Sequence, residues 1–156
     1  MLNKTIQRDE VRSIAFSMEK TIHILLADDD YQVLSALRFV LEQEPAWLVT
    51  NEFLNAEQMI LHFKGAGQWE DTCDEPTAGY AVILLIDLEL PGFQPKIHIP
   101  EIRRLCPQIK IVGLSVMVAA HREHINSQVD AFVSKSDAPE RVIAALNDLM
   151  VQLFPS

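Results

Sequence analysis

The sequence predicts an α/β domain in which a five-stranded parallel sheet is doubly wound, with helices on both of its faces. Three observations lead to this prediction. Short apolar runs of strand length recur along the chain, segments with helical spacing of apolar residues separate them, and most of the runs end in a polar side chain suited to chemistry. Parallel strands need a crossover connection, usually a helix, so this alternation is typical of a parallel sheet.

Each expected element follows from a local pattern. The expected strands cover residues 21–27, 47–51, 81–86, 109–114 and 130–134. The run at 81–86 reads AVILLI, which predicts a central strand that is buried on both faces. The expected helices cover residues 33–41, 56–63, 97–105 and 119–127, and a last helix follows Asp137. We expect Asp137 to cap that helix, with Glu140 three residues later completing the pattern.

Length and composition indicate one compact domain. The chain has 156 residues, of which 49% are hydrophobic and 22% are charged, close to the average for globular proteins. We assign residues 21–154 to this domain and residues 1–20 to a polar leader or a short extra helix. Residues 65–79, GAGQWEDTCDEPTAG, show no periodicity and are expected to form a long exposed loop.

The charge of the chain excludes some classes of partner. Its formal net charge of -9 repels polyphosphate, so we expect this chain itself to bind no nucleic acid. Such a charge favours cationic partners, and clustered carboxylates are suited to a divalent metal.

The lack of a recognisable targeting signal and the small number of cysteines predict a cytoplasmic protein. The N-terminal residues lack the apolar stretch of a signal peptide, and no apolar run is long enough to span a bilayer. Cys73 and Cys106 are too few for a disulfide framework, and no Cys-x-x-Cys is present, so reduced thiols are expected. We therefore expect a cytoplasmic protein that does not associate with membranes.

The strand ends carry the candidate chemistry. Asp28 and Asp29 follow the first expected strand, Asp87 follows the third, Ser115 the fourth and Lys135 the fifth. The carboxyl ends of parallel strands meet at one edge, where ligands bind in open α/β sheets. Crowded carboxylates repel one another unless a cation is present, and oxygen ligands suit Mg²⁺. A carboxylate can also attack phosphorus, while a metal and a lysine stabilise the charge on the phosphoryl oxygens.

At this point the sequence resembles the receiver domains of two-component response regulators. The motifs are ILLADDD, LLIDLELPG, IVGLS and AFVSK, and they occur in the family's order and spacing. The stretch KSDAPERVIAAL is similar to the subgroup that often precedes a helix-turn-helix DNA-binding domain. The resemblance implies a flavodoxin-like three-layer sandwich with strand order 2-1-3-4-5, and a role in phosphorelay signalling and transcription regulation.

The resemblance also implies a role for each site residue. Asp87 would be the phospho-acceptor, with Lys135 contacting its carboxylate or the phosphoryl group. Ser115 would bond to a phosphoryl oxygen, and Phe132 would change rotamer with it as part of the switch. The implied ligands of Mg²⁺ are the carboxylates of Asp28, Asp29 and Asp87 and the backbone carbonyl of Glu89.

The implied partner is a sensor histidine kinase or a phosphotransfer protein, and family members often form homodimers. The implied chemistry is that of a signalling phospho-acceptor with at most slow self-dephosphorylation, not that of an enzyme. Two departures from the family pattern stand out. Val116 replaces a smaller residue, so its stiff side chain is expected to narrow phosphoryl access, and SQVDAF lacks the usual glycine before the last strand.

Two other functions stay open at the level of sequence. A degenerate receiver would keep the fold and bind a partner without phosphorylation of Asp87. A small-molecule phosphatase of the haloacid-dehalogenase type also uses a strand-end aspartate. Its Asp-x-Asp motif usually lies on the first strand, whereas this chain has Asp87-Leu88-Glu89 after the third, which disfavours that function.

Overall fold

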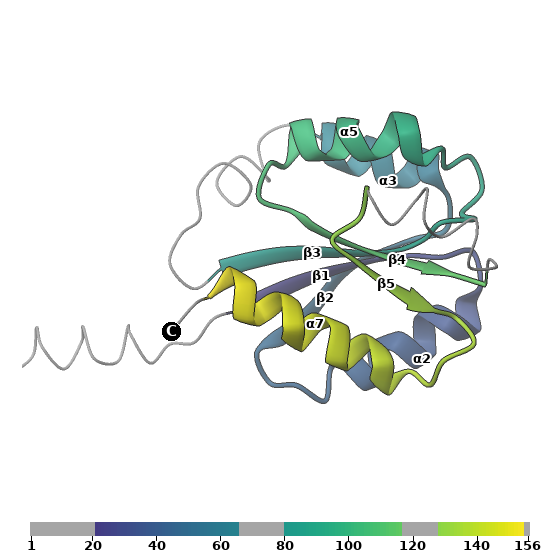
Figure 1. Ribbon diagram of the computed structural model, residues 1–156. Helices are drawn as coiled ribbons and strands as arrows, with labels where there is room; N and C mark the ends of the chain where they lie inside the picture. The colour runs from purple at the N-terminus through teal and green to yellow at the C-terminus, as the bar shows by residue number, and fades with distance from the viewer. Residues whose placement is uncertain (1–20, 66–79, 117–127, 155–156) are drawn as a thin grey trace, which may run out of the picture.

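The computed structural model describes residues 21–65, 80–116 and 128–154. These residues form a five-stranded parallel sheet in the order β2-β1-β3-β4-β5, which confirms the predicted fold class and strand order (Figure 1). The strands are β1 (Thr21–Ala27), β2 (Trp47–Phe53), β3 (Tyr80–Asp87), β4 (Lys110–Ser115) and β5 (Ala131–Ser134). Strand β2 continues to Phe53, two residues beyond the predicted end, because it stays paired with β1 up to Ala27.

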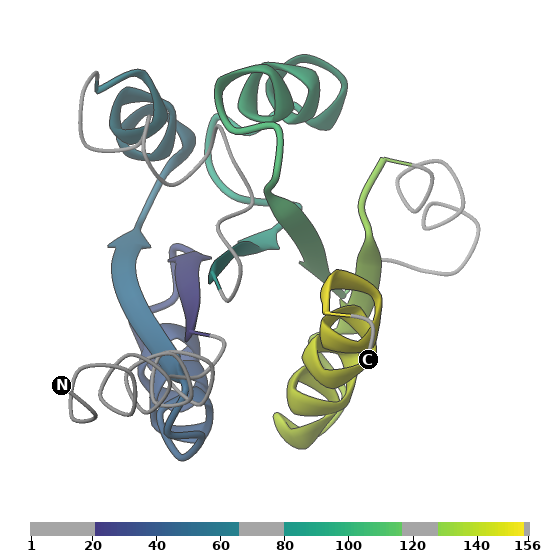
Figure 2. The same cartoon turned by 90° about the vertical axis from the view of Figure 1, so that its left-hand side faces the viewer.

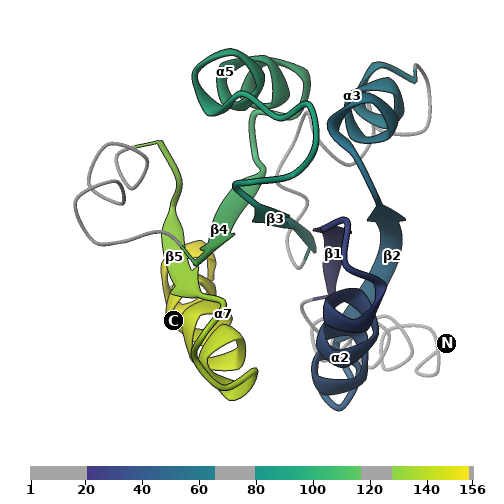
Figure 3. The ribbon, with the colours of Figure 1, turned by 90° about the vertical axis from the view of Figure 1, so that its right-hand side faces the viewer.

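Four helices in the described residues cover the two faces of the sheet. They are α2 (Tyr31–Leu41), α3 (Ala56–Lys64), α5 (Pro95–Leu105) and α7 (Glu140–Leu153). Helices α2 and α7 lie on one face and α3 and α5 on the other, as the two end views show (Figures 2 and 3). Among the described residues, no helix has the length and apolar character needed to cross a bilayer.

The core consists of two apolar layers, one on each side of the sheet. Along β1, Ile22, Ile24 and Leu26 face α2 and α7, while Leu25 and Ala27 face α3 and α5. The residues of β3 alternate in the same way, and both sets are almost completely buried. The successive side chains of a strand point to opposite faces, so a strand covered on both sides must be apolar throughout. The continuous apolar run at 81–86 therefore indicates that β3 lies at the centre of the sheet.

A close contact fixes the chain immediately after β3. The backbone N–H of Leu88 donates to the carbonyl of Leu114 at 2.9 Å, which keeps the chain beside β4 after Asp87. Leu88 then packs over Gly113, where an added Cβ would lie 2.9 Å from Leu88 Cδ1. Glycine at 113 therefore allows Leu88 to lie against the sheet and helps to set the position of Asp87.

An ion-pair network anchors the start of β5. Arg103 Nη2 donates to the carbonyl of Gln128 at 2.8 Å and to Asp130 Oδ2 at 3.1 Å. The same carboxylate oxygen accepts the backbone N–H of Ile111 at 2.8 Å. Asp130 thus ties α5, β4 and the entry to β5 together.

Two sequence expectations are wrong. Asp137 does not cap the last helix, because α7 begins at Glu140 after Pro139, with no side-chain hydrogen bond to its first turn. Cys106 is fully buried and disulfide-bonded, so the expectation of a reduced thiol fails at that residue.

Other expectations fall outside the described residues. They are the leader at 1–20, nearly all of the loop at 65–79 and the whole of the expected helix at 119–127.

We predict that Gly113→Ala lowers the free energy of unfolding by about 1–3 kcal/mol, the usual cost of overpacking a core. The new methyl group would displace Leu88, so the cost should shrink in a Leu88→Ala background, where space is available. Urea denaturation of the wild type, both single variants and the double variant measures this coupling. Equal costs in the two backgrounds would rule out the contact with Leu88 as the cause.

Candidate functional site

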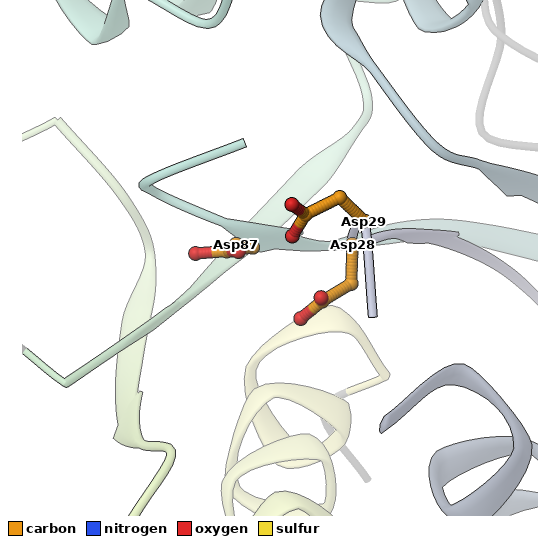
Figure 4. A group of neighbouring side chains, drawn as sticks. All are labelled: Asp28, Asp29 and Asp87. Atoms are coloured by element: carbon orange, nitrogen blue, oxygen red, sulfur yellow. The ribbon is translucent and has the colours of Figure 1, made fainter. Parts of the chain in front are cut away.

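Three carboxylates meet at the carboxyl edge of the sheet. Asp28 and Asp29 follow β1 directly, and Asp87 is the last residue of β3. Ala27 pairs with Ile86 across the two strands, so the next residues, Asp28 and Asp87, lie side by side. Figure 4 shows the three carboxylates gathered beyond the strand ends. One oxygen from each lies within 4.8 Å of the other two.

Backbone amides fix the direction of the two buried carboxylates. Asp28 is 1% exposed and Asp87 is 3% exposed, whereas Asp29 faces solvent. Asp28 Oδ1 accepts the N–H of Asp30 at 2.8 Å, and Asp87 Oδ1 accepts the N–H of Glu89 at 2.9 Å. Each bond joins an aspartate to the amide two residues later, the geometry of an Asx-turn. The second oxygen of each carboxylate is left to point into the site.

Lys135 joins the two buried carboxylates. Its Nζ atom lies 2.7 Å from Asp28 Oδ2 and 3.0 Å from Asp87 Oδ2, and 19% of its side chain is exposed. Lys135 follows β5, and its backbone N–H donates to the carbonyl of Ser115 at 3.0 Å. The lysine therefore reaches across the ends of β4 and β3 to the end of β1, so stretches far apart in the chain meet at this edge.

Burial and charge oppose each other in this cluster. Burial raises the pKa of Asp28 above its ordinary value, although the hydrogen bond from Lys135 acts in the other direction. Burial by itself would lower the pKa of Lys135, but hydrogen bonds and attraction from Asp28 and Asp87 outweigh it and raise that pKa. The lysine is therefore held as the ammonium form.

The donor set of the cluster fits a hard divalent cation. Asp28, Asp29 and Asp87 offer only oxygen atoms, which are the ligands that Mg²⁺ prefers. Within the described chain, one ammonium faces these three carboxylates, so negative charge is in excess. Asp28 Oδ2 is buried, and among the described residues its close contact is with the ammonium of Lys135 at 2.7 Å.

Ser115 contacts a residue whose side chain the sequence did not single out. Ser115 is fully buried at the end of β4, and its Oγ donates to Glu89 Oε1 at 3.1 Å. The sequence pointed to Glu89 only for its backbone carbonyl. Asp87 pairs with Leu114 in the sheet register, and this pairing places Glu89 near the end of β4. That register is the signal that would have suggested the contact between Ser115 and Glu89.

The remaining candidates occupy the surroundings of the cluster. Phe132, in β5, is half-buried and packs against the core layer beneath α3 and α5. Val116 directly follows Ser115 and is 62% exposed. Asp30 caps α2 by accepting the N–H of Gln32 at 2.9 Å.

Comparisons with known proteins identify the fold. No protein-family model and no curated protein matches the sequence. Among solved structures, RcsB of Salmonella enterica serovar Typhimurium, bound to a promoter in the presence of phosphomimetic BeF3⁻, aligns with a TM-score of 0.67 and 24% identity. That alignment covers 83% of this chain and 60% of the RcsB chain, so this chain spans less than two thirds of that relative.

Two other solved chains agree more closely with this one in length. The REC domain of the same RcsB with BeF3⁻ aligns at a TM-score of 0.66 and 24% identity, covering 83% of this chain and 88% of that one. A LuxR-family two-component response regulator from an Aurantimonas species aligns at a TM-score of 0.66 and 20% identity, covering 85% and 86%. The described residues therefore have the receiver fold of two-component response regulators.

We predict that Lys135→Met lowers the free energy of unfolding by about 2–5 kcal/mol in metal-free buffer, because it leaves two buried carboxylates without their cation. Urea denaturation measures the loss. Adding Asp28→Asn should recover part of it, because that change removes one of the two buried charges.

Lys96→Met, at an exposed position on α5, serves as the matched control. A loss in Lys135→Met no larger than in this control would contradict the assignment of Lys135 as the counter-ion.

Proposed function

We propose that the chain is a phospho-accepting receiver in which Asp87 takes a phosphoryl group from a histidine kinase or a phosphotransfer protein. The observation that carries this proposal is the contact of Lys135 Nζ with Asp87 Oδ2 at 3.0 Å, beside the carboxylates of Asp28 and Asp29. A lone strand-end aspartate has many uses. An aspartate that contacts a partly buried ammonium and lies beside other carboxylates is suited to accept a phosphoryl group.

The chemical step requires little of the protein beyond positioning. A carboxylate oxygen of Asp87 forms a bond to phosphorus, the bond from phosphorus to the donor histidine breaks, and the imidazole leaves with that electron pair. Lys135 neutralises negative charge on the acceptor and on the phosphoryl oxygens. The backbone N–H of Glu89 keeps the acceptor carboxylate oriented through Asp87 Oδ1.

A magnesium ion fits this proposal. The carboxylates of Asp28, Asp29 and Asp87, with the backbone carbonyl of Glu89, would hold it. When bound, Mg²⁺ supplies positive charge that offsets repulsion between the carboxylates and the incoming phosphoryl group. This accounts for the excess of negative charge in the cluster.

The proposed output is a change of conformation that controls transcription. Ser115 and Phe132 are the proposed switch residues, because one ends β4 and the other lies in the adjacent strand β5. The proposed receiver covers residues 21–154 and acts in the cytoplasm, as a monomer or homodimer. We propose that DNA contact belongs to other segments or partners, because this chain carries a net charge of -9. Turnover of the phosphoryl group would be at most slow self-dephosphorylation.

We predict that acetyl phosphate with Mg²⁺ adds the mass of one phosphoryl group to the intact wild-type protein and adds none to Asp87→Asn. The amide of asparagine is a poor nucleophile toward phosphorus, whereas the carboxylate of Asp87 is positioned to attack. Intact-protein mass spectrometry measures the product.

Asp148→Asn, at an exposed position of α7, is the matched control and should be phosphorylated like the wild type. An unmodified wild type with every phosphodonor, together with unchanged partner binding by Asp87→Asn, would favour the degenerate binding module instead.

We also predict that Asp29→Asn weakens the apparent affinity for Mg²⁺ by roughly 10- to 100-fold, as is typical when a metal site is damaged. The rise in melting temperature with Mg²⁺ concentration gives the affinity, because a ligand that binds the folded state stabilises it.

Asp30→Asn is a matched control with the same change of charge one residue later, and asparagine preserves the helix cap. Equal losses in the two variants would show that general charge, and not ligation by Asp29, attracts the cation.

A further inference from the structure

The hydroxyl of Ser115 is already engaged in this structure. Ser115 is fully buried, and its Oγ donates to Glu89 Oε1 at 3.1 Å. A serine hydroxyl has a single proton to donate. While that proton lies on the hydrogen bond to Glu89, the hydroxyl cannot donate it to a phosphoryl group on Asp87.

The backbone of Glu89 is held at the same place. Its N–H donates to Asp87 Oδ1 at 2.9 Å, and Leu90, the next residue, donates its N–H to the carbonyl of Asp87 at 3.0 Å. This tight turn brings the Glu89 side chain beside the end of β4. Asp87, which would receive the phosphoryl group, therefore also fixes the position of Glu89. Phosphorylation of Asp87 would act directly on Glu89 for this reason.

Charge makes the contact sensitive to phosphorylation. The Glu89 carboxylate adds to the three of Asp28, Asp29 and Asp87, and the described residues bring one ammonium, Lys135, into contact with this cluster. A phosphoryl group would bring further negative charge close to Glu89. Repulsion would then favour movement of the exposed Glu89 side chain away from the site, and Ser115 would be released.

We propose that the Glu89 carboxylate is a positioning residue that holds Ser115 in its unphosphorylated arrangement and competes with the phosphoryl group for the Ser115 hydroxyl. This inference rests on the proposed function and deepens it. When only a fraction of the protein molecules is in the arrangement that can bind a ligand, the apparent affinity for that ligand is reduced by that fraction. Removal of the Glu89 carboxylate should therefore tighten the binding of a phosphoryl mimic.

The test is a double-mutant cycle on the full chain, with beryllofluoride and saturating Mg²⁺ as the probe. Melting temperature is titrated with beryllofluoride for the wild type, Glu89→Ala, Ser115→Ala and the double variant. We expect Glu89→Ala to tighten the apparent affinity by roughly three- to tenfold when Ser115 is present, the effect of losing one hydrogen bond to a charged group. In the Ser115→Ala background the same change should have a much smaller effect, due to charge alone.

Conservative and matched controls sharpen the result. Glu89→Gln keeps an acceptor oxygen without the charge and should tighten affinity less than Glu89→Ala. Glu44→Ala removes an exposed carboxylate just before β2, at the opposite edge of the sheet, and should leave the affinity unchanged.

The remaining outcomes separate failure of this inference from failure of the proposed function. If the wild type binds beryllofluoride but Glu89→Ala has the same effect with and without Ser115, Glu89 acts only through its charge and the inference is overturned. If Glu89→Ala weakens binding or leaves it unchanged, the inference is likewise overturned. If the wild type accepts neither beryllofluoride nor a phosphoryl group, the proposed function falls and this inference falls with it.

Discussion

The site depends on one buried ion-pair cluster, in which the ammonium of Lys135 lies between the carboxylates of Asp28 and Asp87. Charges of this kind are costly to remove from water and are tolerated only when they are closely paired. Among the residues that the structure describes, one cation contacts this group of two buried carboxylates and a third that is exposed. The cluster is therefore incompletely neutralised, and a site in that condition favours a divalent cation.

The rest of the fold can be understood as the support of that cluster. The register of β1 and β3 places Asp28 beside Asp87, and the hydrogen bond of Lys135 to the carbonyl of Ser115 brings β5 to the same edge. Leu88 packs over Gly113, which holds the chain after Asp87 against β4. At the opposite edge, Asp130 binds Arg103 and the N–H of Ile111, so β5 keeps its place although no glycine precedes it. Rigid strands can thus hold charged groups that would otherwise repel one another.

Much of the fold and the site could be predicted from the sequence, because both follow from local patterns. Apolar runs of strand length between helical segments predicted the sheet, and the polar residues at strand ends predicted which side chains meet. The errors arose where a local pattern had competing solutions. Asp137 and Glu140 have the spacing of a helix cap, yet the helix begins after Pro139, whose ring presets the backbone angle of a first turn. The disulfide bond of Cys106, which is itself buried, depends on the fold of the chain, and the number of cysteines in a sequence does not show it.

The sequence by itself determined the fold class, the strand order through its resemblance to receivers, and the membership of the acidic cluster with Lys135. These features are encoded in periodicity and in the residue that ends each strand. Only the tertiary structure decided that Lys135 contacts both Asp28 and Asp87, and that the hydroxyl of Ser115 donates to the side chain of Glu89. Such contacts depend on side-chain direction and on distances of a few ångströms between segments far apart in the chain. Spacing along a sequence carries no information on that scale, because hydrogen bonds and ion pairs form only when the atoms are close and correctly oriented.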